Sequence, residues 1–182
     1  MSEPERPADV LGFWRDAGPA RWFTPDPAFD ELCRRRYLPA YDDAVASRLA
    51  GWEENPDGAL ALVILLDQMP RNMFRGTPRV WQADPLALAA AERALANGYD
   101  AAVDAELRPF LYLPFMHAED LRAQERSVAL FETLGAADNL RFARHHHAVV
   151  ARFGRFPHRN DVLRRPSTPE ELAFLEEDPF RG

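Results

Sequence analysis

The sequence predicts an all-α protein made of packed antiparallel helical hairpins. Three observations lead to this prediction. Apolar residues recur at helical spacing along most of the chain, proline or capping residues stand where helices would begin, and glycines stand where they would end. The apolar run at 59–69 could also be a buried strand, but no partner strands surround it.

The first half of the chain shows helices separated by clear breaks. The first expected helix ends near Gly18, and the second begins at about Pro27 and carries Pro39, which would kink or divide it. A turn at 55–58 leads into the helix over 59–69. That segment is apolar on every side, which predicts a central, buried helix.

The second half continues the helical pattern. A helix is expected over 84–98, with Asp84 as its cap. The segments 118–135 and 136–154 read as an antiparallel pair, each closed by a glycine. The last helix opens with a capping box that Thr168 begins.

Composition indicates an ordinary globular domain. The chain is 47% hydrophobic and 28% charged, and its 182 residues predict a single domain over 1–182 with a flexible segment at 1–7. No apolar run reaches the roughly 20 residues of a membrane helix, and the start has no hydrophobic signal core. Cys33 is the one cysteine, so a disulfide within the chain is excluded. Together these features predict a cytoplasmic protein without a membrane partner.

Charge is distributed unevenly along the chain. The net charge of −7 argues against nucleic-acid binding, yet residues 141–165 hold seven arginines against a single acid, Asp161. This local excess predicts a site for an anion. All 22 basic residues are arginine, so neither a lysine Schiff base nor a phosphate-loop lysine is available.

A first polar cluster, LLDQMPRNMFRG at 65–76, interrupts the central apolar helix. Asp67 lies on its apolar face and would need a partner to be buried, and Arg71 stands four residues on. Asn72 and Arg75 are expected to contribute hydrogen bonds to the same site. A structural ion pair between helices is the alternative for Asp67.

A second polar cluster follows the helix over 136–154. His146 stands in the middle of the apolar stripe, whereas His145 and His147 flank it nearer solvent. A lone histidine on such a stripe is more often a core residue, but here the chain runs on into RFGRFPHRN at 152–160. That stretch supplies the expected ligand-binding residues Arg152, Arg155, Arg159 and Asn160 and a further titratable residue, His158.

A third cluster, LPFMHAED at 113–120, contributes His117 and Glu119. Acids at the start of a helix are already favoured by its dipole, and H-x-E is a weak metal signal. A metal site would need His117, Glu119, His146 and His158 to converge, which their spacing does not require. We therefore predict neither a metal nor another cofactor.

The three clusters, in this order, resemble an uncharacterised bacterial family described as tetratricopeptide-like. The resemblance runs from VLGFWRDAGPARWFTPDPAFD through LALVILLDQMPRNMFRG, LPFMHAEDLRAQ and RFGRFPHRN to STPEELAFL. The family pattern places one histidine before RFGRFPHRN, which falls on His146. The resemblance implies a fold of helical hairpins and brings no known reaction.

Two functions fit these residues, and whether the protein is an enzyme stays open. In the first, the clusters share one pocket for a small carboxylate or phosphate. Asp67 or His146 would then be the base and His158 or His117 the acid. In the second, the fold is a peptide-binding module whose arginines hold an acidic or C-terminal carboxylate group. The alternative to both is a set of structural ion pairs.

Overall fold

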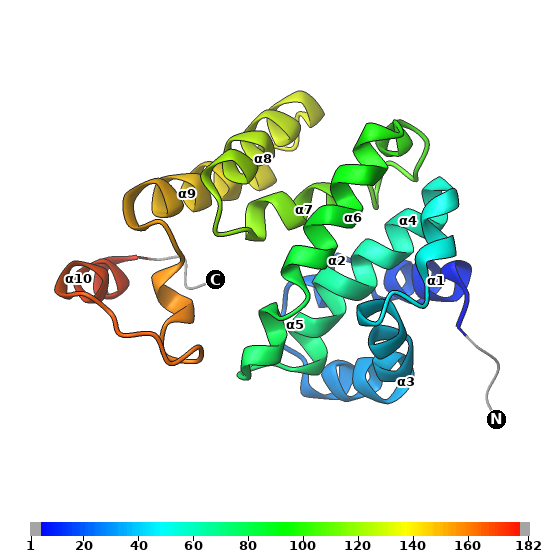
Figure 1. The fold of residues 1–182 in the computed structure, drawn as a ribbon, viewed down its shortest axis with the longest axis horizontal. Helices are drawn as coiled ribbons and strands as arrows, with labels where there is room; N and C mark the ends of the chain where they lie inside the picture. The colour runs from blue at the N-terminus through cyan, green and yellow to red at the C-terminus, as the bar shows by residue number, and fades with distance from the viewer. Residues whose placement is uncertain (1–4, 179–182) are drawn as a thin grey trace. The chain divides into compact units, whose positions relative to one another are not determined.

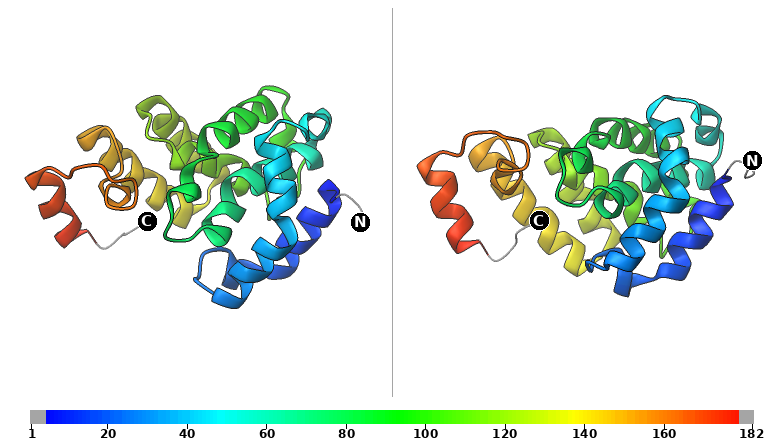
Figure 2. Two further views of the ribbon diagram at one scale, coloured as in Figure 1. Left: turned by 60° about the horizontal axis from the view of Figure 1, so that its bottom comes forward. Right: turned by 90° about the horizontal axis from the view of Figure 1, so that it is seen from below.

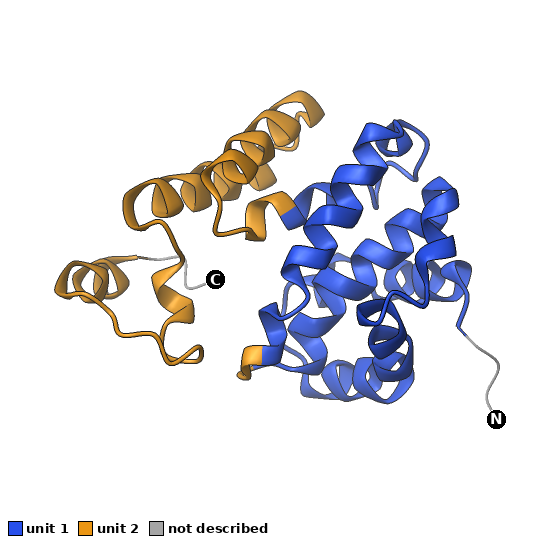
Figure 3. Ribbon diagram, viewed as in Figure 1, with its two compact units in different colours: residues 1–75, 79–114 blue, residues 76–78, 115–182 orange. Residues whose placement is uncertain are grey.

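The computed structural model describes residues 5–178, and throughout this range the chain is helical or irregular, without a strand (Figure 1). The all-α prediction is therefore confirmed for the described residues. The chain divides into two compact units, one made of Met1–Arg75 and Arg79–Pro114 and the other of Gly76–Pro78 and Phe115–Gly182 (Figure 3). We refer to them as unit 1 and unit 2.

The first helices of unit 1 begin at proline residues, and side-chain caps contribute to these starts. Its elements, in chain order, are α1 (Pro7–Ala17), α2 (Pro19–Trp22), α3 (Pro27–Val45), η1 (Ala50–Glu54), α4 (Pro56–Val63), η2 (Ile64–Gln68), α5 (Met69–Met73), η3 (Pro78–Trp81, which begins at the unit boundary), α6 (Asp84–Ala96), η4 (Tyr99–Ala101) and α7 (Pro109–His117, which ends in unit 2). Asp26 caps α3 by accepting hydrogen bonds from the N–H groups of Ala28 and Phe29. Pro39 lies inside α3 without dividing it.

The two views in Figure 2 show α1 and α3 next to each other, and aromatic contacts join them. The ring of Phe13 lies 4.9 Å from that of Tyr37 and 5.4 Å from that of Phe29, centroid to centroid. The hydroxyl of Tyr37 donates to the backbone carbonyl of Asp9 at 3.0 Å. The expected flexible segment 1–7 is only partly described, and within it Pro7 is already helical.

The buried helix over 59–69 is confirmed, but it changes geometry along its length. Every residue from Gly58 to Val63 in α4 is buried, and so is every residue of η2. η2 is a π-helical turn, in which the N–H of Met69 bonds the carbonyl of Ile64. Pro70 has no N–H to offer the carbonyl four residues earlier, and the wider turn accommodates this gap. The turn carries the buried Asp67.

One capping prediction is wrong. Asp84 is the first residue of α6, and Ala83 before it provides no side-chain cap. The carboxylate of Asp84 instead contacts the guanidinium of Arg71 at 3.2 Å. A charged partner on another helix competes with the local cap, and the sequence does not reveal that partner.

Unit 2 contains the predicted antiparallel hairpin. Its elements, after the end of α7, are α8 (Leu121–Leu134), α9 (Ala137–Phe153), η5 (Pro157–Arg159) and α10 (Pro169–Glu177). Gly135 and Gly154 end α8 and α9 with φ angles of 73° and 70°, in the left-handed region that favours glycine. The capping box begun by Thr168 is also confirmed.

None of the helices in the described part of the chain is both long and apolar enough to cross a membrane.

Candidate functional site

A small hollow in unit 2 collects three of the five histidines of the chain. Its lining residues are His145, His146, Val149, Phe156, His158, Phe174 and Asp178. It holds about 230 Å³ of empty space, part of which is open to solvent, and its interior has room for about one water molecule. We call it the histidine hollow.

Three elements position these side chains. His145, His146 and Val149 project from the last turns of α9. Gly154 ends that helix, and the chain turns back so that Phe156, which is 1% exposed, packs on the imidazole of His146 with ring centroids 5.2 Å apart. The hollow therefore exists because a left-handed glycine lets the chain fold back over its own helix.

The remaining walls come from η5 and α10. The ring of His158 lies 5.5 Å from that of Phe156, and the ring of Phe174 stacks on that of His145 at 6.4 Å. Asp178 ends α10 and places its Oδ2 3.4 Å from Nε2 of His145.

The tautomer of His146 follows from its hydrogen bond. Nδ1 lies 2.9 Å from the backbone carbonyl of Phe142, and because a carbonyl oxygen only accepts, Nδ1 carries the proton. Nε2 of the neutral ring is then a hydrogen-bond acceptor. The ring is half-buried and closely packed, and this burial lowers the pKa of His146 to about 3, with a further contribution from the neighbouring histidines.

His158 is also uncharged near neutral pH. Burial lowers the pKa of His158 to about 4, and the guanidinium of Arg159 lowers it further, against the opposing effect of Glu119 and Asp178. The hollow therefore presents two neutral imidazoles to whatever enters it.

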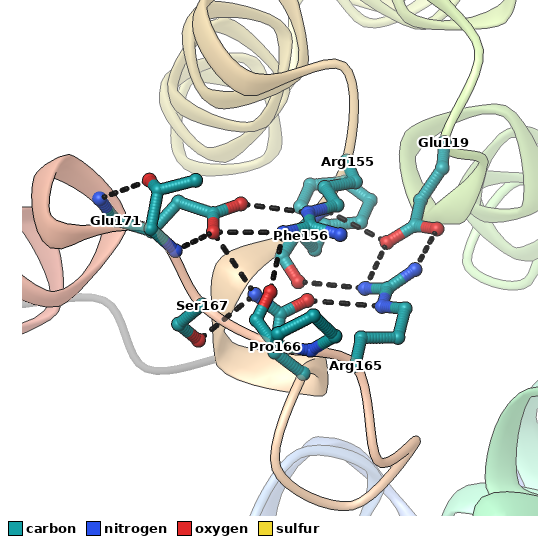
Figure 4. A network of polar contacts seen from close by, with 9 residues as sticks. Glu119, Arg155, Phe156, Arg165, Pro166, Ser167 and Glu171 are labelled. Atoms are coloured by element: carbon teal, nitrogen blue, oxygen red, sulfur yellow. Dashed lines mark hydrogen bonds and ion pairs between the residues drawn. The ribbon is translucent and has the colours of Figure 1, made fainter.

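A polar network beside the hollow involves Glu119 (Figure 4). Arg165 donates to both oxygens of Glu119, at 2.6 and 2.8 Å, and the N–H of Phe156 donates to the same carboxylate at 2.8 Å. Although partial burial acts in the opposite direction, these donors lower the pKa of Glu119. Glu119 thus fixes the backbone turn that carries Phe156.

The same network continues through Glu171 (Figure 4). Arg155 donates to its two oxygens at 2.7 and 2.8 Å, and the N–H of Thr168 and the amide of Asn160 donate as well. Chiefly because of Arg155, the pKa of Glu171 falls to about 2. Arg155 also donates to the carbonyl of Pro166. Because Glu171 lies on α10, Arg155 joins the end of α9 to α10.

The other two arginines of RFGRFPHRN also have partners within unit 2. Arg152 contacts Glu170 at 2.8 Å in an exposed pair. Arg159 is 6% exposed, donates to the backbone carbonyl of His117 at 2.9 Å, and lies 4.5 Å from the ring centroid of Phe156. None of these three arginines lines the histidine hollow as far as the described residues show.

The polar residues of the cluster at 65–76 lie in unit 1, where they form contacts of their own. Asp67 is fully buried, contacts Gln68, and lies 3.5 Å from Arg71, which also meets Asp84. Although burial opposes it, the carboxylates of Asp67 and Asp84 raise the pKa of Arg71. This is the structural ion pair that the sequence offered as the alternative for Asp67.

Asn72 and Arg75 bind a carboxylate that the sequence did not single out. Asp30, on α3, accepts from the amide of Asn72 at 2.8 Å and from Arg75 at 2.8 and 3.1 Å. These contacts tie α3 to α5 within unit 1.

The twelve predicted site residues thus fall into two groups. His117, Glu119, His146, Arg152, Arg155, His158, Arg159 and Asn160 lie in unit 2, and Asp67, Arg71, Asn72 and Arg75 lie in unit 1. Within unit 2 the structure brings His146 and His158 to one hollow, whereas the arginines turn to carboxylates and backbone carbonyls.

Sequence reasoning missed several residues of this region. Arg165 and Glu171 anchor the network, and Phe174 and Asp178 line the hollow. The capping box gave a signal for Glu171, because it fixed the start of α10, but it did not indicate that Arg155 would bind the same carboxylate.

A metal site finds no support in these contacts. Glu119 is engaged by Arg165 and by a backbone N–H, and over residues 5–178 no three histidine, cysteine or carboxylate side chains are placed to hold a metal ion together.

Comparison with known proteins places the chain among relatives. Residues 10–179 match the model of a family described as "Bacterial protein of unknown function (DUF924)". The chain belongs to this family. A solved structure, described as a protein of unknown function from Agrobacterium tumefaciens, is 48% identical and superposes with a TM-score of 0.91, over 94% of this chain and 97% of that one. No curated protein matches the chain.

Proposed function

We propose that the histidine hollow of unit 2 binds a small polar molecule. The observation that carries the proposal is the state of His146, which uses Nδ1 within its own helix, leaves Nε2 as an acceptor, and lines a hollow together with His158. A few polar groups converging on a mainly apolar concavity, with perturbed pKa values, are typical of ligand sites.

The pKa values limit the chemistry that this site supports. At neutral pH His146 and His158 lack the second proton that a general acid would donate, so the role of acid predicted for His158 is disfavoured. If the ligand reacts, His146 is suited to accept a hydrogen bond rather than a proton, because a pKa of about 3 makes its imidazole a weak base. Binding is therefore the core of the proposal, and turnover is an extension of it.

The arginine contacts bear on the anionic ligand that the sequence predicted. A carboxylate or phosphate would have to displace Glu171 from Arg155, or Glu170 from Arg152. The pair with Glu171 is largely buried and well hydrogen-bonded, which makes the exchange costly. A ligand held through the imidazoles needs no such exchange.

The experiment is a fragment screen read by histidine NMR. Long-range ¹H–¹⁵N spectra at pH 7 are expected to show the Nδ1-protonated tautomer for His146, and neither His146 nor His158 is expected to take up a proton above pH 5. Small polar fragments should shift the signals of both rings. Binding should be lost in His146→Gln and retained in His147→Gln, the matched change one residue along the helix. Fragments that bind equally well to both variants would contradict the proposal.

A second candidate is the peptide-binding module, and one observation favours it. Arg152 and Glu170 form a pair whose side chains are 52% and 63% exposed, so Arg152 can exchange partners with little loss. A peptide with a terminal carboxylate would then bind wild-type protein and lose affinity in Arg152→Gln. The control is Arg144→Gln, because Arg144 lies on α9 like Arg152 and forms a similarly exposed pair with Glu132 of α8. Equal binding to both variants would argue against this module.

A further inference from the structure

We infer that the ligand of the histidine hollow carries a compact cationic group, of the ammonium type, rather than an anion. The inference rests on the proposed function, because it names the chemical class of the molecule that occupies the same hollow. It depends on the charge, the hydrogen-bonding groups, the aromatic walls and the size of the hollow.

Among residues 5–178, the charged side chain that lines the hollow is a carboxylate. Asp178 is 9% exposed, and the other polar lining residues are the three histidines. The arginines that lie over the lining rings of Phe156 and Phe174 already have acceptors, since Arg159 donates to the carbonyl of His117 and Arg152 is paired with Glu170. A ligand anion would therefore meet a like charge at Asp178, whereas a cation would meet a carboxylate that already lies 3.4 Å from Nε2 of His145 and can accept from both.

The hydrogen-bonding groups favour a donor. An ammonium group offers three N–H donors and no acceptor. Nε2 of His146 is an acceptor, because Nδ1 carries the proton, and the carboxylate of Asp178, 3.4 Å from Nε2 of His145, offers acceptors as well. A ligand carboxylate would bring further acceptors to a wall that already holds two.

The aromatic walls favour the same charge. Phe156 and Phe174 both line the hollow, and the ring of His145 is stacked on that of Phe174. The face of an aromatic ring attracts a cation within about 6 Å of its centroid. Arginines already lie over both rings, with Arg159 4.5 Å from the centroid of Phe156 and Arg152 5.9 Å from that of Phe174. The part of each ring that lines the hollow is thus also a favourable surface for an ammonium group.

Size restricts the group to a small one. The interior has room for about one water molecule, and an ammonium group is of similar size. The remainder of the molecule would lie in the part of the hollow that opens to solvent. A short alkylammonium therefore fits better than a bulkier cation such as a quaternary amine.

The test titrates four probes into ¹⁵N-histidine-labelled protein at pH 7: n-butylammonium chloride, ammonium chloride, sodium butyrate and n-butanol. n-Butylammonium is expected to shift the signals of His146 and His158 with saturation, whereas butyrate and butanol leave them in place. Saturation by ammonium chloride alone, with no gain from the butyl chain, would place the whole affinity in the cationic group and still support the inference.

Two variants show which groups carry the binding. Asp178→Asn keeps the shape of the side chain and should weaken n-butylammonium binding about tenfold, whereas Glu177→Gln removes the same charge one residue earlier, at an exposed site, and should change it less than twofold. If Asp178→Asn disturbs the end of α10, Phe174→Leu is a second test, and its affinity for n-butylammonium should be several-fold lower than that of the wild type.

The outcomes separate this inference from the proposed function. Binding of butyrate or butanol but not of n-butylammonium would overturn the inference and leave the hollow a binding site. Unchanged n-butylammonium affinity in both Asp178→Asn and Phe174→Leu would also overturn it. If neither these probes nor any polar fragment shifts His146 and His158, the proposed function fails as well.

Discussion

Replacing Glu171 by glutamine tests whether the network of Figure 4 holds unit 2 together. The side chain of Glu171 is 3% exposed and accepts hydrogen bonds from Arg155, from Asn160 and from the N–H of Thr168. Its neighbour Glu170 offers a matched control, because it pairs with an arginine too but does so in solvent.

The magnitude follows from the pKa of Glu171. A fall from 4.5 to about 2 corresponds to an upper limit of about 3.4 kcal/mol, since one pKa unit is worth about 1.4 kcal/mol. Arg155 is partly exposed, and solvent screening reduces this value. We therefore expect Glu171→Gln to lower the free energy of unfolding of unit 2 by about 2 kcal/mol at pH 7, and Glu170→Gln to lower it by less than about 0.5 kcal/mol.

The pH dependence has a definite sign. The pKa of Glu171 is lower in the folded than in the unfolded state, so its contribution is complete above about pH 4.5 and is lost as the pH falls through about 2. The difference between wild type and Glu171→Gln should therefore shrink by more than half between pH 7 and pH 3.

Hydrogen exchange of the amides in α9 and α10 is the appropriate assay. All four tryptophans lie in unit 1, so their fluorescence would report on the other unit. Equal losses for Glu170→Gln and Glu171→Gln, or a difference that persists unchanged at pH 3, would refute the assignment of the stabilising charge to Glu171.

Three further predictions concern unit 1. Asp67→Ala should destabilise unit 1 by about 3 kcal/mol in urea denaturation, because the substitution leaves the largely buried Arg71 with one carboxylate fewer. Asp43→Ala removes a carboxylate from an exposed pair and should cost less than about 0.5 kcal/mol. Gly58→Ala should cost about 2–3 kcal/mol of stability, since its Cβ would lie 2.1 Å from a backbone oxygen. Gly51→Ala places its Cβ in open space and should be neutral. Equal shifts of the thermal unfolding midpoint in the two variants would contradict this. Cys33 should resist a thiol reagent such as DTNB until the protein is denatured, because burial raises the pKa of its thiol to about 12; rapid labelling of folded protein would disprove it.

Local signals predicted the helices well. Pro27 starts α3, Gly135 and Gly154 end the two helices of the hairpin, and Thr168 begins the capping box of α10. Each of these residues acts on a backbone within a few positions of itself, so its effect is contained in the sequence. Asp84 failed as a cap because an arginine on another helix binds its carboxylate.

The partners of the ionisable residues were predicted less well. The clusters were correctly recognised as places where polar groups interrupt apolar faces, and Asp67 does have the arginine partner that its burial demands. The sequence did not show that Asp30 would bind Arg75, or that Arg165 would bind Glu119 across 46 positions. Such pairs depend on how helices pack, and many arginines compete for many carboxylates in this chain.

The sequence by itself determined the all-α architecture of the described residues, the positions of most helix ends and the central place of His146 on its helix, because all three depend on periodicity and short-range backbone preferences. Only the tertiary structure decided which charges neutralise one another and which polar groups remain to line a hollow. Side chains far apart in the chain, such as Phe156 and Asp178, acquire their neighbours only when the helices pack. The charge and protonation state of the site follow from that packing.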